Sequence, residues 1–301
     1  MHASPLTSSE DITLISIIPS SQLINNWKEA FQIDITVELS DCEEIYLYQC
    51  NQTKLFFFEP SSATGSGWLY EQLQKFDWFY MTHKWEHKVA LQDLRDCHNV
   101  LEVGCAFGSF VQAGLKAGLN IQGIELNKAA VEVAQSNGLP VQNLDLQEYA
   151  DKYSDSLDAL CSFQVLEHIP NPKDFLAWAI QTLKANGKLI LCTPNAESFL
   201  KYQYNLLDMP PHHMTRWSEK TFRSLEKIFP IRLEKVAKEP LMPYQVSGYL
   251  SSYSGYFRSQ SQLNKIWLNW YTLRFYEKAF QLGLRKYLTG QSLYVQFRKL
   301  P

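Results

Sequence analysis

The stretch at residues 100–110, VLEVGCAFGSF, contains the first residues whose spacing suits ligand binding, because Gly104 and Gly108 stand four apart after an apolar run. A glycine turn at the end of a strand lets the backbone approach a ligand, and the helix that follows offers free amide groups. Such turns also occur for purely structural reasons. Glu125 closes the next apolar run, where a carboxylate can accept hydrogen bonds from both hydroxyls of a ribose. The turn lacks the G-x-G-x-x-G spacing of pyrophosphate sites, so it favours a nucleoside without phosphates.

Three histidines are candidates for acid–base chemistry. His168 follows the apolar run at 157–165, and His212 and His213 belong to the segment PHHMTRWS at 211–218. Imidazole exchanges protons near neutral pH, so a histidine can accept the proton that an attacking hydroxyl loses. For each histidine taken singly, a helix cap or a core hydrogen bond is the structural alternative. We expect His168 and His213 to act as the base, and His212 to turn toward the preceding prolines.

The segments that must position these residues alternate between strand-like and helical patterns. Strands are expected at 99–104, 121–126, 141–146, 157–165 and 188–194, and helices at 109–118, 128–138 and 173–187. Gly118, Gly138 and Gly187 fall where these helices should end. Strands joined by helices of this length make right-handed crossovers and a mostly parallel sheet, whose ligands bind at the carboxyl ends of the strands.

The sequence predicts four parts. A front module at 1–75 contains a hairpin formed by EEIYLYQC and KLFFFEP, with helical stretches following at 68–80 and 83–94. The core is expected at 76–239, an aromatic helical lid at 240–290, and the last strand of the core sheet at 291–301, which contains SLYVQFRK.

Five motifs in order resemble those of the class I S-adenosylmethionine-dependent methyltransferases. They are the turn at 104–108, IELN at 124–127, LDL at 144–146, SFQVLEHIPNP at 162–172 and PHHMTRWS at 211–218. The last motif is similar to that of a branch acting on small molecules or glycans. The resemblance implies an α/β, Rossmann-like fold with a seven-stranded, mostly parallel sheet and an antiparallel last strand. Ala106 replaces the middle glycine of the usual G-x-G-x-G, which should tighten the methionine pocket slightly.

The resemblance also implies S-adenosylmethionine as cofactor and gives it a set of binding residues. Those expected around the methionine part are Gly104, Cys105, Ala106 and Gly108. Those expected at the ribose and adenine are Glu125, Leu126, Asp145 and Leu146. Those expected near the sulfonium or closing the methionine end are Phe163, Gln164, Tyr80 and Trp85, of which the last two have packing of an entry helix as the alternative.

The expected acceptor is a small molecule or a glycan. Enzymes of this class that methylate adenine, cytosine or glutamine amide nitrogens carry an Asn/Asp-Pro-Pro-aromatic motif where this chain has SFQV. A net charge of −3 gives no general attraction to nucleic acid, which is excluded as a partner. A hydroxyl oxygen that attacks the methyl group in line with the departing sulfur is therefore the leading expectation, with nitrogen or carbon as alternatives.

Residues 240–290 carry an aromatic pattern with three possible roles. Trp267, Tyr271 and Phe275 are spaced four apart, which predicts one amphipathic helix. Such a helix can pack on the sheet edge, act as a lid or acceptor platform, or make a weak peripheral membrane contact. Eight basic residues and one acid follow residue 240, which suits a bulky or anionic acceptor.

The front hairpin is similar to a Cys-x-x-Cys hairpin that precedes the core in some relatives of this branch. Thr53 stands where the second cysteine would be, and Cys50 and the distant Cys42 are the only cysteines nearby. A structural zinc site needs four ligands, so we assign no metal. The six cysteines are scattered, and neither a signal peptide nor an apolar membrane span is evident, which predicts a reduced, cytoplasmic protein.

Two other functions stay open. A catalytically silent relative that serves as a cofactor-binding or assembly protein would be expected to lack the cofactor acids, whereas Glu125 and Asp145 are both present. A nucleotide-dependent oxidoreductase is disfavoured because the pyrophosphate fingerprint is missing.

Overall fold

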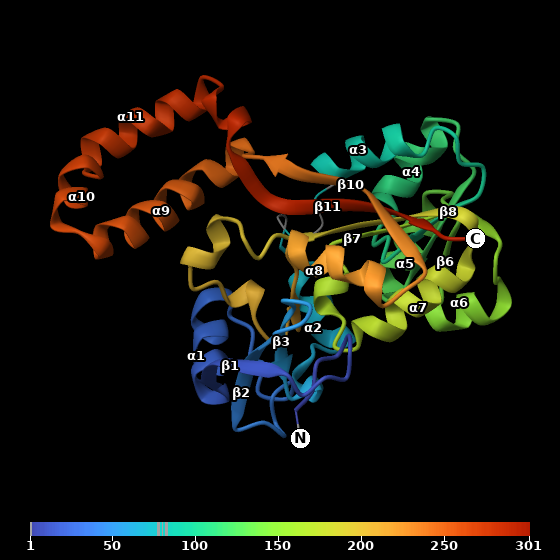
Figure 1. The fold of residues 1–301 in the computed structure, drawn as a ribbon, viewed down its shortest axis with the longest axis horizontal. Coiled ribbons are helices and arrows are strands. Elements are labelled where there is room, and N and C mark those ends of the chain that lie inside the picture. Colours follow the sequence, from blue (N-terminus) through green and yellow to red (C-terminus); the bar gives the residue numbers. More distant parts are fainter. Residues whose placement is uncertain (1, 77–78, 80, 82–83) are drawn as a thin grey trace.

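The computed structural model describes residues 2–76, 79, 81 and 84–301, in which two β-sheets organise the chain (Figure 1). The larger sheet has the strand order β10 (Ile231–Pro240), β11 (Thr289–Lys299), β8 (Leu183–Pro194), β7 (Leu157–Phe163), β4 (Val100–Val103), β5 (Ile121–Glu125) and β6 (Val141–Asn143). Strands β4 to β8 pair in parallel, while β11 runs antiparallel to both β8 and β10. The expected seven-stranded sheet with an antiparallel last strand is confirmed.

The strand order determines where a ligand can bind. β4 lies between β5 and β7, so the crossovers that follow β4 and β6 lead to opposite halves of the sheet. At such a switch point the loops diverge and leave a crevice at the carboxyl ends of the strands. The glycine turn follows β4 directly and therefore lies at this crevice.

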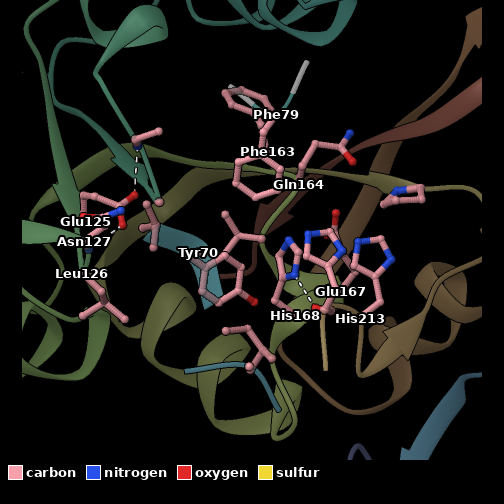
Figure 2. Close-up of a pocket in the computed structure, with 18 of the residues that line it drawn as sticks. Tyr70, Phe79, Glu125, Leu126, Asn127, Phe163, Gln164, Glu167, His168 and His213 are labelled. Carbon is pink, nitrogen blue, oxygen red and sulfur yellow. Dashed lines mark hydrogen bonds between the residues drawn. The ribbon is translucent and has the colours of Figure 1, made fainter. Parts of the chain in front are cut away.

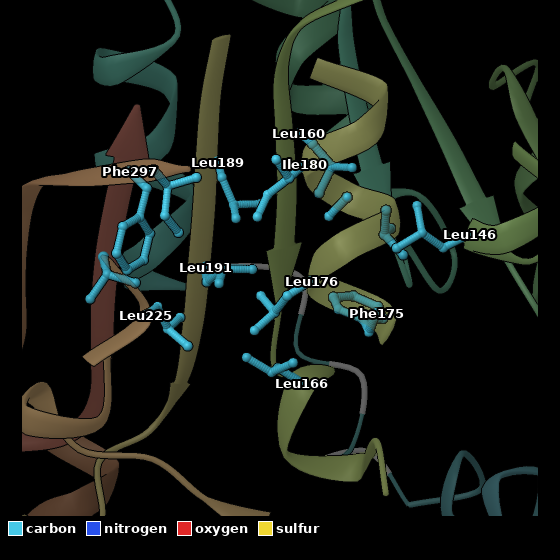
Figure 3. Close-up of a cluster of buried hydrophobic side chains, with 14 of the residues drawn as sticks. Leu146, Leu160, Leu166, Phe175, Leu176, Ile180, Leu189, Leu191, Leu225 and Phe297 are labelled. Carbon is cyan, nitrogen blue, oxygen red and sulfur yellow. The ribbon is translucent and has the colours of Figure 1, made fainter. Parts of the chain in front are cut away.

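Helices cover both faces of the large sheet. Successive residues of a strand point to opposite sides, so the apolar strands present two apolar faces, and each is buried under helices. Leu101 and Leu189 belong to the cluster on one face, which Figure 3 shows with its neighbours on α7, whereas Val100 and Ile190 belong to the cluster on the other. The helices on the first face are α6 (Leu146–Lys152), α7 (Pro172–Thr182) and α8 (Glu219–Ser224), and those on the second are α3 (Trp85–Asp93), α4 (Ser109–Lys116) and α5 (Lys128–Ser136). The core is therefore a three-layer sandwich.

The connection from α7 to β8 differs from the expected helix at 173–187. The helix ends at Thr182, and β8 begins at Leu183, which pairs with Leu157 of β7. Gly187 lies inside β8, so the prediction that it ends a helix is wrong. Leu183 pairs with Leu157 and the next pair joins Lys188 to Ala159, so pairing with β7 brackets this segment, and a helical pattern in the sequence cannot reveal that competition. The other two glycines follow the ends of α4 and α5 with positive φ, as expected, at Gly118 and Gly138.

The smaller sheet joins the front of the chain to the histidine segment. Its strands, in order, are β1 (Ile12–Pro19), β2 (Glu44–Cys50), β3 (Phe56–Glu59) and β9 (Thr215–Arg216). β2 and β3 form the expected hairpin, and α2 (Gly67–Leu73) follows it, whereas β1 and α1 (Ser20–Phe31) were not predicted. β3 pairs with β9, and the Phe58 N–H donates to the carbonyl of Met214 at 2.9 Å. The hairpin thus holds the backbone directly after His213.

The segment before β11 is helical, as expected, and projects from the core in Figure 1. It consists of α9 (Val246–Gln260), α10 (Gln262–Trp267) and α11 (Trp270–Gln281). The prediction of one continuous aromatic helix is wrong, because α10 ends before Asn269 and α11 begins after it. The Asn269 side chain caps α11 by accepting from the Tyr271 and Thr272 N–H groups. Trp267 and Tyr271, which are 70% and 77% exposed, therefore lie on different helices.

Two further expectations concern the whole chain. None of the described helices has the length and apolar character needed to cross a membrane. All six cysteines are buried and free.

Candidate functional site

A cavity of about 790 Å³ opens at the carboxyl ends of β4, β5 and β7. This volume falls within the range of about 300–1,000 Å³ that is common for small-molecule sites. Figure 2 shows its two ends, one lined by Glu125, Leu126 and Asn127 and the other by Glu167, His168 and His213.

The glycine turn forms part of the cavity wall. Gly104 has a φ of +73°, and a Cβ atom there would lie 2.4 Å from Cγ2 of Val165, so no side chain fits. Ala106 adopts a φ of +47° and lines the cavity together with Gly104. Cys105 and Gly108 do not line it, because the Cys105 side chain is buried in the core and Gly108 directly precedes α4. These two residues shape the turn.

Glu125, the last residue of β5, is held by two backbone donors. The Ala106 N–H donates to Oε2 at 2.9 Å, and the Asn127 N–H donates to Oε1 at 2.8 Å. A carboxylate offers about four acceptor positions, so two remain for a ligand. Because Ala106 belongs to the glycine turn, Glu125 also ties the turn after β4 to the end of β5.

Three expected residues lie together beyond Glu125. Asp145 caps α6, since its Oδ1 accepts from the Glu148 N–H at 2.7 Å, and it lines the cavity. Leu126 and Leu146 line the same region, and Leu126 is 70% exposed. An acid between two apolar side chains suits the amino edge and faces of a purine.

The end of β7 and the residue after it supply Phe163 and Gln164, which line the cavity. Gln164 has a φ of +57°, and its Nε2 donates to Oε1 of Glu86 at 3.3 Å. Trp85, at the start of α3, lines the cavity as well. Tyr80, the other residue expected near the methionine end, lies outside the described residues.

The three histidines form one cluster on the cavity wall. Their ring centroids are 4.6 Å apart for His168 and His212, 4.9 Å for His168 and His213, and 4.5 Å for His212 and His213. The expectation that His212 turns toward the prolines is wrong, because its Nδ1 lies 2.7 Å from the carbonyl of Leu207 and its ring stacks on that of His213. The structure thus brings together residues from two distant motifs.

Burial determines the protonation of the cluster. It lowers the pKa of His168 to about 4, against the opposing effect of the carbonyls of His212 and Gln164. It also lowers the pKa of His212 and of His213 well below the usual range. All three imidazoles are therefore neutral near pH 7.

Two carboxyl groups at the same end were not identified from the sequence. Glu167 is 2% exposed, its Oε2 has no hydrogen-bond partner among the described residues, and burial raises its pKa to about 8. Burial raises the pKa of Asp208 to about 6, although its ion pair with Arg216 at 2.9 Å opposes the rise. Each acid is close in sequence to a histidine motif, but proximity of that kind is common and is a weak signal.

Further cavity residues come from elements scattered along the chain. They include Tyr70, Glu86, Trp178, Glu239 and Tyr244. No shared motif links them, so only the tertiary structure identifies them. The lining residues that the structure describes all fall outside 246–288, so α9 to α11 form no part of the wall.

A family model and several known proteins match part of the chain. A family model described as a methyltransferase domain matches residues 50–229. A ubiquinone biosynthesis O-methyltransferase of Nitrosococcus oceani is 31% identical over 102 residues, which are 32% of this chain and 43% of that protein. The protein of the same name from Coxiella burnetii is 27% identical over 143 residues, which are 40% of this chain and 61% of that protein. The chain therefore spans less than two thirds of the length of these relatives.

A solved structure with a similar fold comes from an archaeal complex. In a Haloferax volcanii complex between the Trm112 methyltransferase activator and a protein described as a methyltransferase, the matched chain has a TM-score of 0.50 and 14% identity. The match covers 72% of this chain and 90% of that chain. At this identity the likeness concerns the fold alone.

Proposed function

Since the chain belongs to the methyltransferase domain family, we propose that it transfers the methyl group of S-adenosylmethionine to an oxygen atom of a small-molecule acceptor. The observation that carries the proposal is the Glu125 carboxylate, which two backbone amides orient beside a glycine turn at the switch point of the sheet. A carboxylate in this place can accept hydrogen bonds from both hydroxyls of a ribose, and the turn beside it lacks the glycine spacing of a pyrophosphate site.

The residues around the cavity fit the three parts of this cofactor. Gly104 and Ala106 present backbone to the methionine part, Glu125 holds the ribose, and Asp145 accepts from the adenine amino group. Leu126 and Leu146 pack against the base, while Phe163, Gln164 and Trp85 enclose the sulfonium end. Cys105 and Gly108 support the turn without touching the cofactor.

S-adenosylmethionine supplies a methyl group already activated by its positively charged sulfur. The chain therefore has to align an acceptor with this group and exclude water, which is the main source of rate enhancement in such a displacement. The aromatic rings of Phe163 and Tyr70 provide apolar surface between the two ends of the cavity.

We place the acceptor hydroxyl beside the histidine cluster. Nδ1 of His168 lies 2.6 Å from the carbonyl of His212, so it donates to that oxygen and leaves Nε2 with a lone pair. A neutral imidazole of this kind can take the proton of the acceptor as the carbon–oxygen bond forms. His213 is the second candidate for this role.

An oxygen acceptor is favoured over nitrogen or carbon because the curated relatives are named O-methyltransferases. Those relatives are named for ubiquinone biosynthesis, and a hydroxylated small molecule agrees with that name. A glycan acceptor, and a silent cofactor-binding protein of the same fold, are the alternatives that the test has to separate.

The test combines cofactor binding with turnover. S-adenosylhomocysteine should bind the purified chain in calorimetry, and a panel of hydroxylated small molecules and sugars should include an acceptor. His168→Ala or His213→Ala should lower turnover by about 10²-fold or more while changing cofactor affinity by less than about 1 kcal/mol, because the base acts only in the transition state. The exposed His98→Ala serves as the matched control. Binding of NADH in place of the methyl donor would overturn the proposal.

A further inference from the structure

We infer that His168, His212 and His213 form a binding site for a divalent transition-metal ion, with zinc as the ion that fits best. The inference rests on the proposed function, since the ion would act on the acceptor of that reaction. One potential ligand atom from each of the three side chains lies within 4.8 Å of the other two. From the sequence we assigned no metal to the chain, on the ground that the front hairpin lacks ligands; a metal site at the histidine cluster departs from that assignment.

The hydrogen bonds of the three rings orient them as metal ligands. In each ring Nδ1 lies next to an oxygen atom. Nδ1 of His168 is 2.6 Å from the carbonyl oxygen of His212, and Nδ1 of His212 is 2.7 Å from that of Leu207. Nδ1 of His213 is 3.2 Å from Oδ1 of Asp208. Oxygen atoms of this kind accept, so each Nδ1 donates and each Nε2 keeps its lone pair. Metal-binding histidines show this pattern, in which the second ring nitrogen donates to a carbonyl or carboxylate.

The Nε2 atom of His212 gives independent support. This side chain is only 6% exposed, and its Nε2 has no hydrogen-bond partner among the described residues. A buried polar atom without a partner is unfavourable unless something in the site satisfies it. The neighbouring imidazoles cannot do so through Nε2, because those atoms are acceptors too, whereas a cation placed among the three rings satisfies all of them at once.

The donor set indicates the kind of ion. Three neutral imidazoles suit zinc, and catalytic zinc sites commonly have three protein ligands and a fourth position left for water or substrate. Zinc–nitrogen bonds of about 2.1 Å keep any two ligand nitrogens within about 4.2 Å of each other, so the rings, whose ligand atoms lie within 4.8 Å, must move together around the ion. Calcium and magnesium prefer oxygen ligands and are disfavoured.

An ion here would act on the acceptor, because all three rings face the cavity. A hydroxyl bound at the fourth position would have a lowered pKa and would lose its proton to water, as zinc-bound water does. The oxygen then uses an electron pair to bond the methyl carbon, while the pair of the carbon–sulfur bond stays on sulfur and leaves a neutral thioether. With an ion bound, the Nε2 lone pairs would be used for coordination, so His168 would not accept the proton itself. The role of His168 as a base applies to the cluster without an ion.

The experiment titrates the full chain, freed of metal by a chelator, with zinc in calorimetry and with cobalt in visible absorption. We expect one ion per chain, and cobalt bands of the intensity typical of four-coordination. His212→Ala should weaken binding by more than about 100-fold. Asp208→Asn keeps all three ligands but changes the partner of His213 and removes the ion pair with Arg216, and it should weaken binding by about 10- to 100-fold. His98→Ala should bind like the wild type.

Binding of S-adenosylhomocysteine to the metal-free chain is measured on the same samples, so the two proposals can fail separately. Cofactor binding without stoichiometric zinc or cobalt would overturn the metal site and leave the methyl transfer intact. Equal loss of metal in the His98 variant would also overturn it. If His212→Ala does not fold, wild-type stoichiometry together with the Asp208→Asn titration decides.

Discussion

Replacement of Glu125 by alanine tests the cofactor site most directly. Its carboxylate accepts from the Ala106 N–H at 2.9 Å and from the Asn127 N–H at 2.8 Å. Two acceptor positions remain, which suffices for the two hydroxyls of a ribose. Hydrogen bonds to a charged group contribute about 1.5–3 kcal/mol each, so losing the ribose contacts should weaken binding by at least that amount, or about 10- to 150-fold.

The assay is calorimetry with S-adenosylhomocysteine, accompanied by thermal melts. Glu125→Ala also deprives two backbone amides of their acceptor, so we expect a lower melting temperature in addition to weaker binding. Glu125→Gln should lie between the wild type and the alanine variant, because it keeps one oxygen acceptor. Glu132→Ala, an exposed residue on the following helix, is the matched control and should change neither quantity.

Unchanged affinity in a folded Glu125→Ala variant would refute the ribose assignment. A lower melting temperature with unchanged affinity would mean that the carboxylate serves only the turn. Weaker binding by the Glu132 variant would mean that overall charge, and not a specific contact, determines affinity.

The remaining predictions concern a buried acid and the projecting helices. Burial raises the pKa of Glu102 to about 8 from 4.5, and Glu125 adds to the rise while Lys84 opposes it. The folded chain therefore keeps a proton that the unfolded chain releases, and between about pH 4.5 and 8 the stability that this group contributes falls as pH rises. Glu102→Gln should remove this loss of stability, which amounts to up to about 5 kcal/mol at pH 8. The check is the free energy of unfolding of both proteins, measured by urea melts between about pH 4.5 and 8. If it changes with pH equally in the two proteins, the reasoning fails. Trp267→Ser combined with Tyr271→Ser should leave the melting temperature unchanged because both side chains are exposed. A raised KM for the acceptor would then assign these helices to a lid, and loss of sedimentation with anionic vesicles at an unchanged KM would assign them to a membrane contact.

Several features of this protein follow from local sequence alone. The alternation of apolar runs with amphipathic segments predicts the parallel strands, since both faces of such strands are buried and their residues are apolar throughout. The glycines at 104 and 108 predict the turn, because only glycine adopts its positive φ without strain. Glu125 is predictable as well, since its place at the end of the second strand of the core follows from the same pattern.

Long-range pairing and local capping, which the hydrophobic pattern does not reveal, decided other features. Pairing of Leu183 with β7 ends α7 early, and the cap at Asn269 divides the aromatic segment into two helices. Both outcomes depend on partners or local competition that the hydrophobic pattern does not encode.

The histidine cluster is the clearest case of this division. The sequence identified His168, His212 and His213 as candidates, but it could not place the two motifs in contact. Pairing of β3 with β9 holds the segment that carries His212 and His213, and the Leu207 carbonyl turns His212 into the cluster. Glu167 and Asp208 become part of the site only through this packing. Residue types and their spacing indicate which chemistry is available. Which of these side chains come into contact depends on long-range backbone pairing and burial, because the residues are remote from one another in sequence.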